Sequence, residues 1–465
     1  MLDFKNKKAL VMGLGLNEEG SGISAVKFLI KAGAQVTVTD LKTKTQLASQ
    51  IKRLGDSAKK IKFVLGHHRE SDFLSADLVL KNPGVPRTSA FLKLASDRGV
   101  PIYTDISLFF QLFGTKKIIG ITGTRGKSTT TSLIYDLIKH KDKGVIIGGN
   151  IQKSPLTQLE SVLGHWAVLE LSSWMLESLE PLKISPHIAV FNNIYPDHLN
   201  TYSGLDDYIS AKKNILRFQN SADFLVINRD NNHTRKIGKE AVSKRFWFSL
   251  KSFDEENGSY IKDQKIFFRR EGIEQEICSV SEVAIIGRHN LENVLGAVTV
   301  AGILGISPKN IKKTIQQFKG IANRLELIKN ISGVDYYNDT TSTTPEATLA
   351  GLKTLGSKRK NIILLAGGAD KGLDFGLLPK NIDKYCKAVI LFSGTGTERL
   401  KKYLKNYSVP LTIVNSMSEA VNLSQAISSS GDVVLLSPAC ASFGMFVNEF
   451  DRGQQFVDCV NNIKL

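Results

Sequence analysis

Short apolar runs alternate with amphipathic stretches along nearly the whole chain, and most of the runs end at glycine, serine, proline or an acid. This alternation predicts parallel strands separated by helices, the pattern of an α/β protein. In residues 7–40, a strand enters a glycine turn, a helix follows over about 23–32, and a second strand ends at Asp40. Further strands are predicted at 77–81, just before the glycine turn that starts at Gly120, at 166–170, from Ile188 towards the turn at Asp197, and at 361–366, 388–392 and 432–436.

The predicted elements fall into three units. The first closes near 113–115, the second opens at the strand before Gly120 and runs to about Gly320, and the third begins near Ile321. Within the second unit, residues 246–283 contain short β segments and charged turns, which predict an antiparallel flap. A chain of 465 residues that is 42% hydrophobic is long enough for about three domains.

The composition narrows the classes of partner. A formal charge of +17 would suit nucleic acid, an anionic lipid or an anionic small molecule. The lysines are spread over predicted surface helices, as at 309–313, without interleaved aromatic residues, so nucleic-acid binding is not expected. No apolar run approaches the roughly 20 residues that a membrane helix needs, and no signal peptide is predicted. The four cysteines lack metal or redox spacing, which is typical of reduced residues in a cytosolic protein.

Residues 116–131 carry the strongest chemical signal. An apolar strand leads into a turn with Gly120, Gly123 and Gly126, followed by Lys127 and Ser128 at the start of a predicted helix. Glycines let backbone N–H groups approach phosphates, a lysine reaches the β and γ oxygens, and a hydroxyl binds Mg²⁺. Five residues rather than four separate the outer glycines, so this is a variant of the common phosphate loop. The sequence therefore predicts ATP binding.

The first glycine turn is a weaker signal. Gly13 and Gly15 precede a helix, and Asp40 stands where a ribose-binding acid would lie in a dinucleotide site. The insertion at 17–19 spoils the spacing, so NAD is not expected. In the third unit, strands end at the polar loops 367–372, 393–396 and 437–442, and loops at the carboxyl ends of parallel strands are the usual ligand sites.

Three further clusters follow the phosphate loop. Glu170 ends a strand and suits Mg²⁺, Asp197 and His198 form a turn after another strand, and Lys212 lies on a helix soon afterwards. Taken singly, each has a plain structural alternative: a helix-capping acid, a hydrogen-bonded turn histidine and a solvated lysine. Their occurrence together, downstream of a phosphate loop, favours a catalytic centre.

With these motifs the chain resembles the muramyl ligases, which are ATP-dependent enzymes that add amino acids during peptidoglycan synthesis. The resemblance covers essentially the whole length, and within the family residues 169–173 and 367–372 favour the glutamate-adding branch over the alanine- or diamine-adding ones. Folylpolyglutamate synthases share the phosphate loop but are not expected to match the first and last units. The matching segments are 120–129, 169–173, 197–198, 211–212, 287–290, 323–324, 338–339, 367–372 and 436–442.

The resemblance implies three domains. These are a Rossmann-like UDP-substrate-binding domain (1–115), a central phosphate-loop ATPase-type α/β domain (116–320) and a Rossmann-like amino-acid-binding domain (321–465). They would close over ATP about hinges near Thr115 and Gly320 in a protein expected to be a cytoplasmic monomer.

The implied chemistry starts with ATP phosphorylating the carboxylate of UDP-N-acetylmuramoyl-L-alanine, after which the amine of D-glutamate attacks the acyl phosphate. Cations must screen the approach of the two anions. By resemblance, one Mg²⁺ would lie on Ser128 and Glu170, and a second on His198 and a carbamylated Lys212. Asn150 would position the γ-phosphate and the substrate. The implied ATP contacts are Gly123, Thr124, Arg125, Gly126, Lys127, Ser128, Thr129, Asn290, Asn293, Arg324 and Asp339.

Two more contact sets follow from the resemblance. The UDP moiety would be held by Leu16, Ser21, Gly22, Asp40, Asn82, Pro83 and Gly84. The added amino acid would be held by Thr343, Lys371, Ser442 and Phe443.

The chain departs from the family pattern at several positions. Thr341 replaces a lysine expected near the reacting phosphates, Gly444 stands where aspartate is frequent, and Arg125, where asparagine is common, would supply the missing charge. Three alternatives therefore stay open beside D-glutamate addition: the same chemistry with L-glutamate or another acidic residue, a catalytically silent protein that binds ATP and a UDP-sugar, and a nucleic-acid-dependent ATPase.

Overall fold

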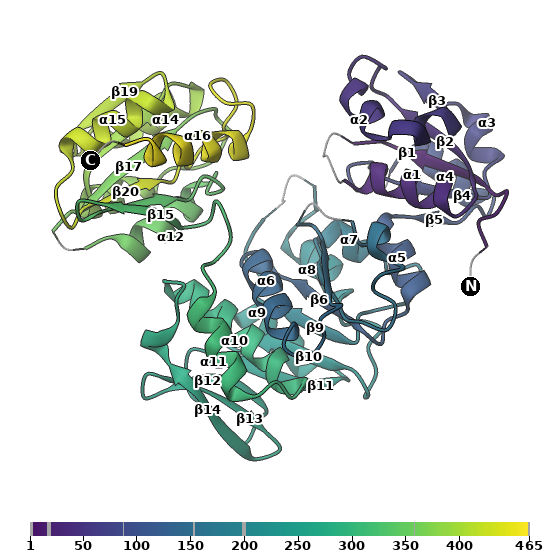
Figure 1. Ribbon diagram of the computed structural model, residues 1–465, viewed down its shortest axis with the longest axis horizontal. Coiled ribbons are helices and arrows are strands. Elements are labelled where there is room, and N and C mark those ends of the chain that lie inside the picture. Colours follow the sequence, from purple (N-terminus) through teal and green to yellow (C-terminus); the bar gives the residue numbers. More distant parts are fainter. Residues whose placement is uncertain are drawn as a thin grey trace. The chain divides into compact units, whose positions relative to one another are not determined.

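The computed structural model describes residues 3–15, 20–86, 88–151, 154–197, 201–357 and 359–463. It has the α/β architecture that the sequence predicts, with three separate sheets flanked by helices (Figure 1). The chain divides into two compact units, of which the first comprises residues 1–284 and 289–318 and the second comprises 285–288 and 319–465.

The first sheet is parallel throughout and has five strands in the order β3-β2-β1-β4-β5. Its central strand β1 is buried from Ala9 to Met12, as expected for a parallel strand covered on both faces. The helix predicted at about 23–32 begins slightly earlier, because Gly20 is its N-cap. The strands are β1 (Lys8–Met12), β2 (Gln35–Asp40), β3 (Ile61–Leu65), β4 (Leu78–Lys81) and β5 (Ile102–Tyr103); the helices are α1 (Ser21–Lys31), α2 (Ala48–Arg53), η1 (Gly55–Lys60), α3 (Glu70–Leu74) and α4 (Ala90–Asp97).

The second sheet has nine strands in the order β14-β13-β12-β11-β10-β9-β6-β8-β7. Neighbours from β7 to β12 pair in parallel, and only the β12–β13 and β13–β14 pairs are antiparallel. The strands are β6 (Ile118–Thr122), β7 (Ile146–Gly149), β8 (Ala167–Glu170), β9 (Ile188–Phe191), β10 (Phe224–Asn228), β11 (Lys244–Ser249), β12 (Gly258–Lys262), β13 (Lys265–Arg270) and β14 (Ile273–Ser279). The helices are α5 (Asp105–Phe113), α6 (Lys127–Ile138), η2 (Pro155–Gln158), α7 (Ser173–Glu177), α8 (Leu205–Lys213), α9 (Asn232–Lys239), η3 (Val280–Glu282), α10 (Arg288–Ile303) and α11 (Pro308–Gln317).

The third sheet, in the second unit, has six strands in the order β15-β16-β20-β17-β18-β19. Alternate residues of β17 enter opposite cores: Leu364 packs on one face, while Ile363 and Leu365 pack on the other. The strands are β15 (Glu326–Ile331), β16 (Val334–Asn338), β17 (Ile362–Gly367), β18 (Cys386–Phe392), β19 (Leu411–Val414) and β20 (Val433–Leu436); the helices are α12 (Pro345–Leu355), α13 (Leu378–Tyr385), α14 (Thr395–Leu404), α15 (Met417–Ile427) and α16 (Glu449–Asn461).

The three sheets fall within the three predicted segments, but the first two segments share one compact unit. They share a hydrophobic core that includes Val26 of α1, Phe109 of α5 and Leu156 of η2. The exact boundaries at 115 and 320 stay predictions.

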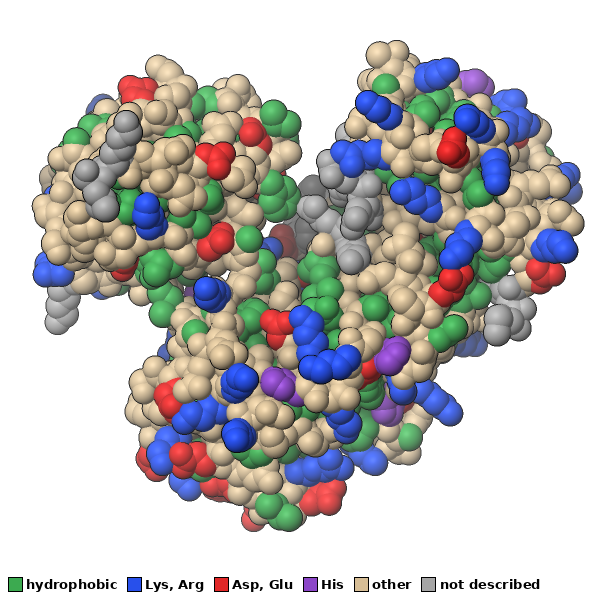
Figure 2. All heavy atoms as spheres, in the orientation of Figure 1, with side chains coloured by type: hydrophobic (Ala, Val, Ile, Leu, Met, Phe, Trp, Pro, Cys, Tyr) green, Lys and Arg blue, Asp and Glu red, His purple; other side chains and the backbone are tan. Residues whose placement is uncertain are grey.

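Three features that were expected from the composition concern the basic side chains, the cysteines and the apolar helices. Lys and Arg side chains are scattered over the face shown in Figure 2 and do not form one stripe. All four cysteines are free, and Cys278, Cys386 and Cys440 are buried. None of the described helices has the length and apolar character needed to cross a bilayer.

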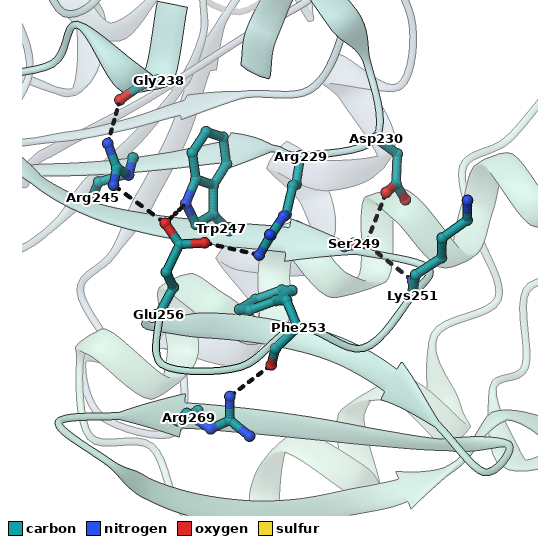
Figure 3. A network of polar contacts seen from close by, with 10 residues as sticks. All are labelled: Arg229, Asp230, Gly238, Arg245, Trp247, Ser249, Lys251, Phe253, Glu256 and Arg269. Atoms are coloured by element: carbon teal, nitrogen blue, oxygen red, sulfur yellow. Dashed lines mark hydrogen bonds and ion pairs between the residues drawn. The ribbon is translucent and has the colours of Figure 1, made fainter. Parts of the chain in front are cut away.

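The predicted flap is a continuation of the second sheet, and the interpretation of 246–283 as wholly antiparallel was wrong for β11. Strands β11 and β12 are parallel, although only residues 250–257 connect them, and parallel neighbours usually need a longer crossover. Glu256 anchors this connection by accepting hydrogen bonds from Arg229 (2.8 Å), Trp247 Nε1 (2.8 Å) and Arg245 (3.3 Å), as Figure 3 shows.

Candidate active site

The predicted phosphate loop lies between β6 and α6, as a strand, a turn and a helix. Gly126 caps α6 with φ +80°, and a Cβ there would lie 2.1 Å from Asn293 Oδ1. Gly123 has φ +152°, and its Cβ would lie 2.9 Å from Asn192 Cβ. Both positions therefore require glycine. No side chain caps α6 and its first turn carries no acid, so the helix N-terminus suits an anion.

The loop is held by a residue that the sequence analysis passed over. Asn193 follows β9, the neighbour of β6 in the sheet. Its Oδ1 accepts from the Arg125 N–H (2.8 Å), its Nδ2 donates to the Arg125 carbonyl (3.2 Å), and its own carbonyl accepts from the Thr124 N–H (2.9 Å). The adjacent Asn192 donates to Thr130 Oγ1 at 2.9 Å. Their position after a strand that borders β6 was the available signal.

Two lysines meet at the same loop carbonyl. Lys127 Nζ and Lys212 Nζ each donate to the Gly123 carbonyl oxygen at 3.0 Å. Lys212, on α8, is only 2% exposed and lies 4.8 Å from the centre of the Tyr208 ring, so its solvated alternative is excluded. Burial, followed by repulsion from Lys127, holds the pKa of Lys212 well below its usual range.

Glu170 lies beside this loop with one unsatisfied oxygen. It ends β8, and it pairs in register with Ile121 of β6. The side chain is 2% exposed; Oε1 accepts from Asn150 Nδ2 at 2.8 Å, whereas Oε2 has no hydrogen-bond partner among the described residues. Ser172, rather than Glu170, caps α7, so the capping alternative is excluded.

This arrangement fits a magnesium ligand. A buried carboxylate oxygen without a protein donor suits a hard cation, and the half-buried Ser128 offers a hydroxyl at the start of α6. His198 lies outside the described residues. Within the described ranges there is no cluster of three or more His, Cys, Asp or Glu side chains able to hold a metal.

Asn290 and Asn293 begin α10 beside the phosphate-loop helix. Asn293 Oδ1 accepts from Thr130 Oγ1 at 3.3 Å, and its Nδ2 donates to Asn290 Oδ1 at 3.3 Å. The structure thus brings these two predicted ATP residues to the loop, near Thr129, which is buried in α6.

The first compact unit, residues 1–284 and 289–318, contains a cavity of about 1460 Å³. Of the predicted UDP contacts, Ser21, Asn82, Pro83 and Gly84 line it, as does Asn150. Leu16 lies outside the described residues.

Two predicted UDP contacts shape the turn behind the cavity instead of lining it. The Asp40 carboxylate accepts the backbone N–H groups of Leu14 and Lys42, both at 2.9 Å. A Cβ on Gly22 would lie 2.3 Å from the Leu14 carbonyl oxygen.

The cavity wall includes buried polar atoms that the sequence analysis did not single out. Asp105, Ser154 and Tyr202 are among the residues that line it, and their side-chain oxygens are buried. Burial raises the pKa of Asp105 and that of Tyr202. The cavity wall is therefore partly polar, which suits a polar ligand.

In the second unit, loops following β16, β17 and β20 meet. Lys371 Nζ donates to Thr343 Oγ1 at 3.0 Å, and Ala369 forms a bridge with Ala441 that brings the loop before Ser442 alongside. Ser442 is buried, whereas Phe443 is 64% exposed. The structure therefore brings together three of the four residues predicted for the amino acid.

The departures from the family pattern have local explanations. Gly444 has φ +106°, a backbone conformation that disfavours the aspartate expected there. Thr341 Oγ1 donates to the Asn323 carbonyl at 2.9 Å. Next to it, the fully buried Arg452 donates to Thr340 Oγ1 (3.0 Å) and to the Thr340 carbonyl (2.9 Å), and burial lowers its pKa to about 10. The sequence analysis missed this cation, whose partners are remote in the chain.

Asp339 is buried at the end of β16. Its carboxylate accepts from Ser437 Oγ (2.8 Å) and from the Leu325 N–H (3.2 Å), and burial raises its pKa to about 6. The neighbouring Arg324 is exposed. Their contacts with ATP stay predictions, as does the compensating role of the exposed Arg125.

The glycine loop, the buried carboxylate beside it and the parallel sheet that carries both define a nucleotide-binding protein of the phosphate-loop class. Three family descriptions match successive segments: "Mur ligase MurD-like, N-terminal domain" at 7–104, "Mur ligase middle domain" at 121–301 and "Mur ligase, glutamate ligase domain" at 323–440. The chain belongs to the Mur ligase family, and the resemblance seen in its motifs is confirmed.

Its relatives include two proteins named "UDP-N-acetylmuramoylalanine--D-glutamate ligase". The one from Borreliella burgdorferi is 40% identical over 465 residues and the alignment covers 99% of each chain; the one from Roseiflexus sp. is 37% identical with 98% of each covered. Among solved structures, the MurC alanine ligase of Thermotoga maritima matches with a TM-score of 0.62 at 19% identity (99% and 100% covered). MurF of Acinetobacter baumannii matches at 0.61 and 16% (98% and 93% covered). These structural matches show the shared fold.

Proposed function

We propose that this chain is an ATP-dependent ligase that joins D-glutamate to UDP-N-acetylmuramoyl-L-alanine. The proposal is supported by its full-length similarity to relatives that carry the corresponding name. The observation that carries the chemistry is the buried, half-satisfied Glu170 carboxylate beside a glycine loop where two lysines share one carbonyl. Such a centre suits phosphoryl transfer between two anions.

In the first step, the N-terminus of α6 and Lys127 hold the triphosphate while the substrate carboxylate attacks the γ-phosphate, the bond from the γ-phosphorus to the bridging oxygen breaks, and ADP leaves. Ser128 and Glu170 would hold one Mg²⁺, and His198 with carbamylated Lys212 a second. When bound, these ions screen the repulsion between carboxylate and phosphate. Asn150, fixed against Glu170, orients the γ-phosphate, and Asn290, Asn293, Arg324 and Asp339 hold the rest of the nucleotide.

Carbamylation of Lys212 is supported by its surroundings. CO₂ adds to a neutral amine, and a buried lysine with a lowered pKa supplies one. The product is an oxygen anion, which hard Mg²⁺ prefers to an amine.

In the second step, the amine of the incoming amino acid attacks the acyl phosphate, and phosphate leaves. Lys371, Thr343 and Ser442 would hold the carboxylates of the acidic substrate, with Phe443 beside it. The cavity of the first unit would take the UDP-sugar, with Ser21, Asn82, Pro83 and Gly84 as contacts. This reaction belongs to peptidoglycan precursor synthesis, on which cell shape and division depend; we place it in the cytoplasm, where ATP is available, and treat the protein as a monomer.

The test is product formation by the purified chain. The chain is incubated with UDP-N-acetylmuramoyl-L-alanine, ATP, Mg²⁺ and each member of a panel of D- and L-amino acids. The masses of the products are then measured by mass spectrometry. We expect a D-glutamyl product and phosphate release that requires all substrates. A product with L-glutamate alone would reassign the amino acid, and binding of both nucleotides without any product would identify a silent relative.

A further inference from the structure

The cavity proposed for the UDP-linked substrate is lined by more acidic than basic described residues. A nucleoside diphosphate sugar brings a diphosphate, which needs cations or N–H donors. Among the described residues that line the cavity, the acids outnumber the cations. The acids are Asp97, Asp105, Glu177 and Asp207; the cations are Lys81 and Lys93. The two lysines are therefore the candidate cationic partners of the diphosphate in the described part of the lining.

Lys81 is the last residue of β4, at the carboxyl edge of the first sheet. It pairs in register with Met12, the last residue of β1, and the next residue, Asn82, donates its N–H to the Met12 carbonyl at 2.9 Å. From β1 the chain moves outward to β2 and β3, and it then returns to β4 on the other side of β1. The strand order therefore reverses between β1 and β4. In open parallel sheets, ligands bind in the crevice at such a reversal.

The same wall carries the N-terminus of α1. Gly15, Gly20 and Ser21 line the cavity together with Lys81, and α1 starts without a side-chain cap or a first-turn acid. A Cβ on Gly15 would lie 2.9 Å from Asn82 Nδ2, so the glycine turn and the turn after β4 are in contact. Lys81 Nζ donates to the Val85 carbonyl at 3.3 Å, which places its ammonium at this turn.

The two cavity lysines differ in environment. Lys81 is half-buried, whereas Lys93 is exposed on α4, one helical turn before Asp97. An ammonium partly removed from water interacts more strongly with an anion than an exposed one beside an acid.

We propose that Lys81 is a cation that binds the diphosphate of the UDP-linked substrate, acting with the N-terminus of α1. This inference rests on the proposed function and adds a residue that determines substrate binding. Lys81 lies at the turn after β4, beside the glycine turn and the N-terminus of α1, so its charge would serve binding of the UDP moiety.

The experiment compares UDP with uridine, which lacks the phosphates, by titration calorimetry on the full chain. In wild type, UDP should bind at least tenfold more tightly than uridine. In Lys81→Met, which keeps the apolar stem, UDP affinity should fall about tenfold while uridine affinity stays within twofold. The matched control Lys93→Met should change neither by more than twofold. Lys81→Arg, which keeps the charge, should retain UDP affinity within threefold and guards against misfolding of Lys81→Met.

Kinetics gives a second readout. Lys81→Met should raise KM for the UDP-linked substrate about tenfold with kcat within twofold, and KM for ATP should not change. Equal weakening of UDP and uridine, or unchanged UDP affinity in Lys81→Met, would overturn the inference. If the wild type forms product and binds UDP, and Lys81→Met does both equally well, the role of Lys81 is refuted but the proposed function stands. If the wild type makes no product with any amino acid, the proposed function itself is refuted.

Discussion

The phosphate loop of the first unit and the loop cluster of the second both follow parallel strands, but they are fixed in different ways. The phosphate loop depends on two glycines with positive φ and on backbone hydrogen bonds to Asn193. The cluster also contains glycines with positive φ, such as Gly368, but it depends in addition on buried ionisable side chains: Asp339, which accepts from Ser437 and Leu325, and Arg452, which donates to Thr340. A loop built on backbone geometry leaves a motif in the sequence, whereas one built on distant side chains does not.

The largest expected effect tests the backbone-built region. Lys127→Ala should lower turnover about a thousandfold, because the triphosphate loses its charged partner at the loop. UDP affinity should stay within twofold, since Lys127 does not line the cavity. Phosphate release and calorimetry measure the two. Lys139→Ala, at the other end of α6, is the control and should keep its rate; substantial turnover by Lys127→Ala would contradict the assigned role.

The second effect concerns the other lysine at the same carbonyl. Lys212→Ala should lower turnover about a hundredfold, and added acetate should restore about a tenth of the lost rate, because the ligand needed is an oxygen anion. Lys213→Ala is the matched control, because the Lys213 ammonium pairs with Glu240 at 3.0 Å instead of contacting the phosphate loop. The turnover of this variant should not respond to acetate. Full activity of Lys212→Ala without acetate would refute the carbamate.

The third effect tests the side-chain-built region through pH. Burial raises the pKa of Asp339 to about 6, against about 3.9 in an unfolded chain. The neutral carboxyl is thus favoured by folding: its contribution to stability is complete below pH about 4 and is lost as pH rises through about 6. Over this interval the unfolding free energy of the wild type, measured with urea, should fall by about 2–3 kcal/mol relative to that of Asp339→Asn, which lacks this contribution. The control Asp335→Asn should keep the pH dependence of the wild type. If Asp339→Asn keeps it as well, the pH dependence does not come from Asp339.

The smallest effect concerns Gly444. Gly444→Asp restores the family residue but places a side chain at φ +106°, so it should cost about 1 kcal/mol of unfolding free energy. Gly444→Ala should cost about the same by thermal or urea unfolding, because the strain lies in the backbone. A loss confined to the aspartate variant would point to charge instead.

The order of strands and helices was predictable because nearly every apolar run ends at a turn signal, and parallel pairing follows from that alternation. Strand neighbours were less predictable, as β11 shows: its sequence looks like an antiparallel hairpin, but Glu256 holds a short connection that makes it parallel to β12. Local sequence does not encode which strand lies beside which.

The candidate site divides in the same way. Gly123, Gly126 and Lys127 form a contiguous motif whose chemistry is plain from spacing. Asn193 acts on Arg125 from 68 positions away, and Arg452 on Thr340 from 112, so neither belongs to the contiguous motif. The family resemblance assigns Asp40 to UDP binding, which stays a prediction; in the structure its carboxylate accepts two backbone N–H groups.

The shared acceptor at Gly123 makes its two lysines thermodynamically dependent on each other. Lys127 is one of the causes that depress the pKa of Lys212, so deleting the first raises the proton affinity of the second and leaves a poorer nucleophile for CO₂. The two alanine variants should therefore be non-additive in combination, with the double variant little worse than Lys127→Ala alone. Under the proposed function, Lys127 would thus have two roles: it would anchor the nucleotide and, together with burial, help to keep Lys212 uncharged.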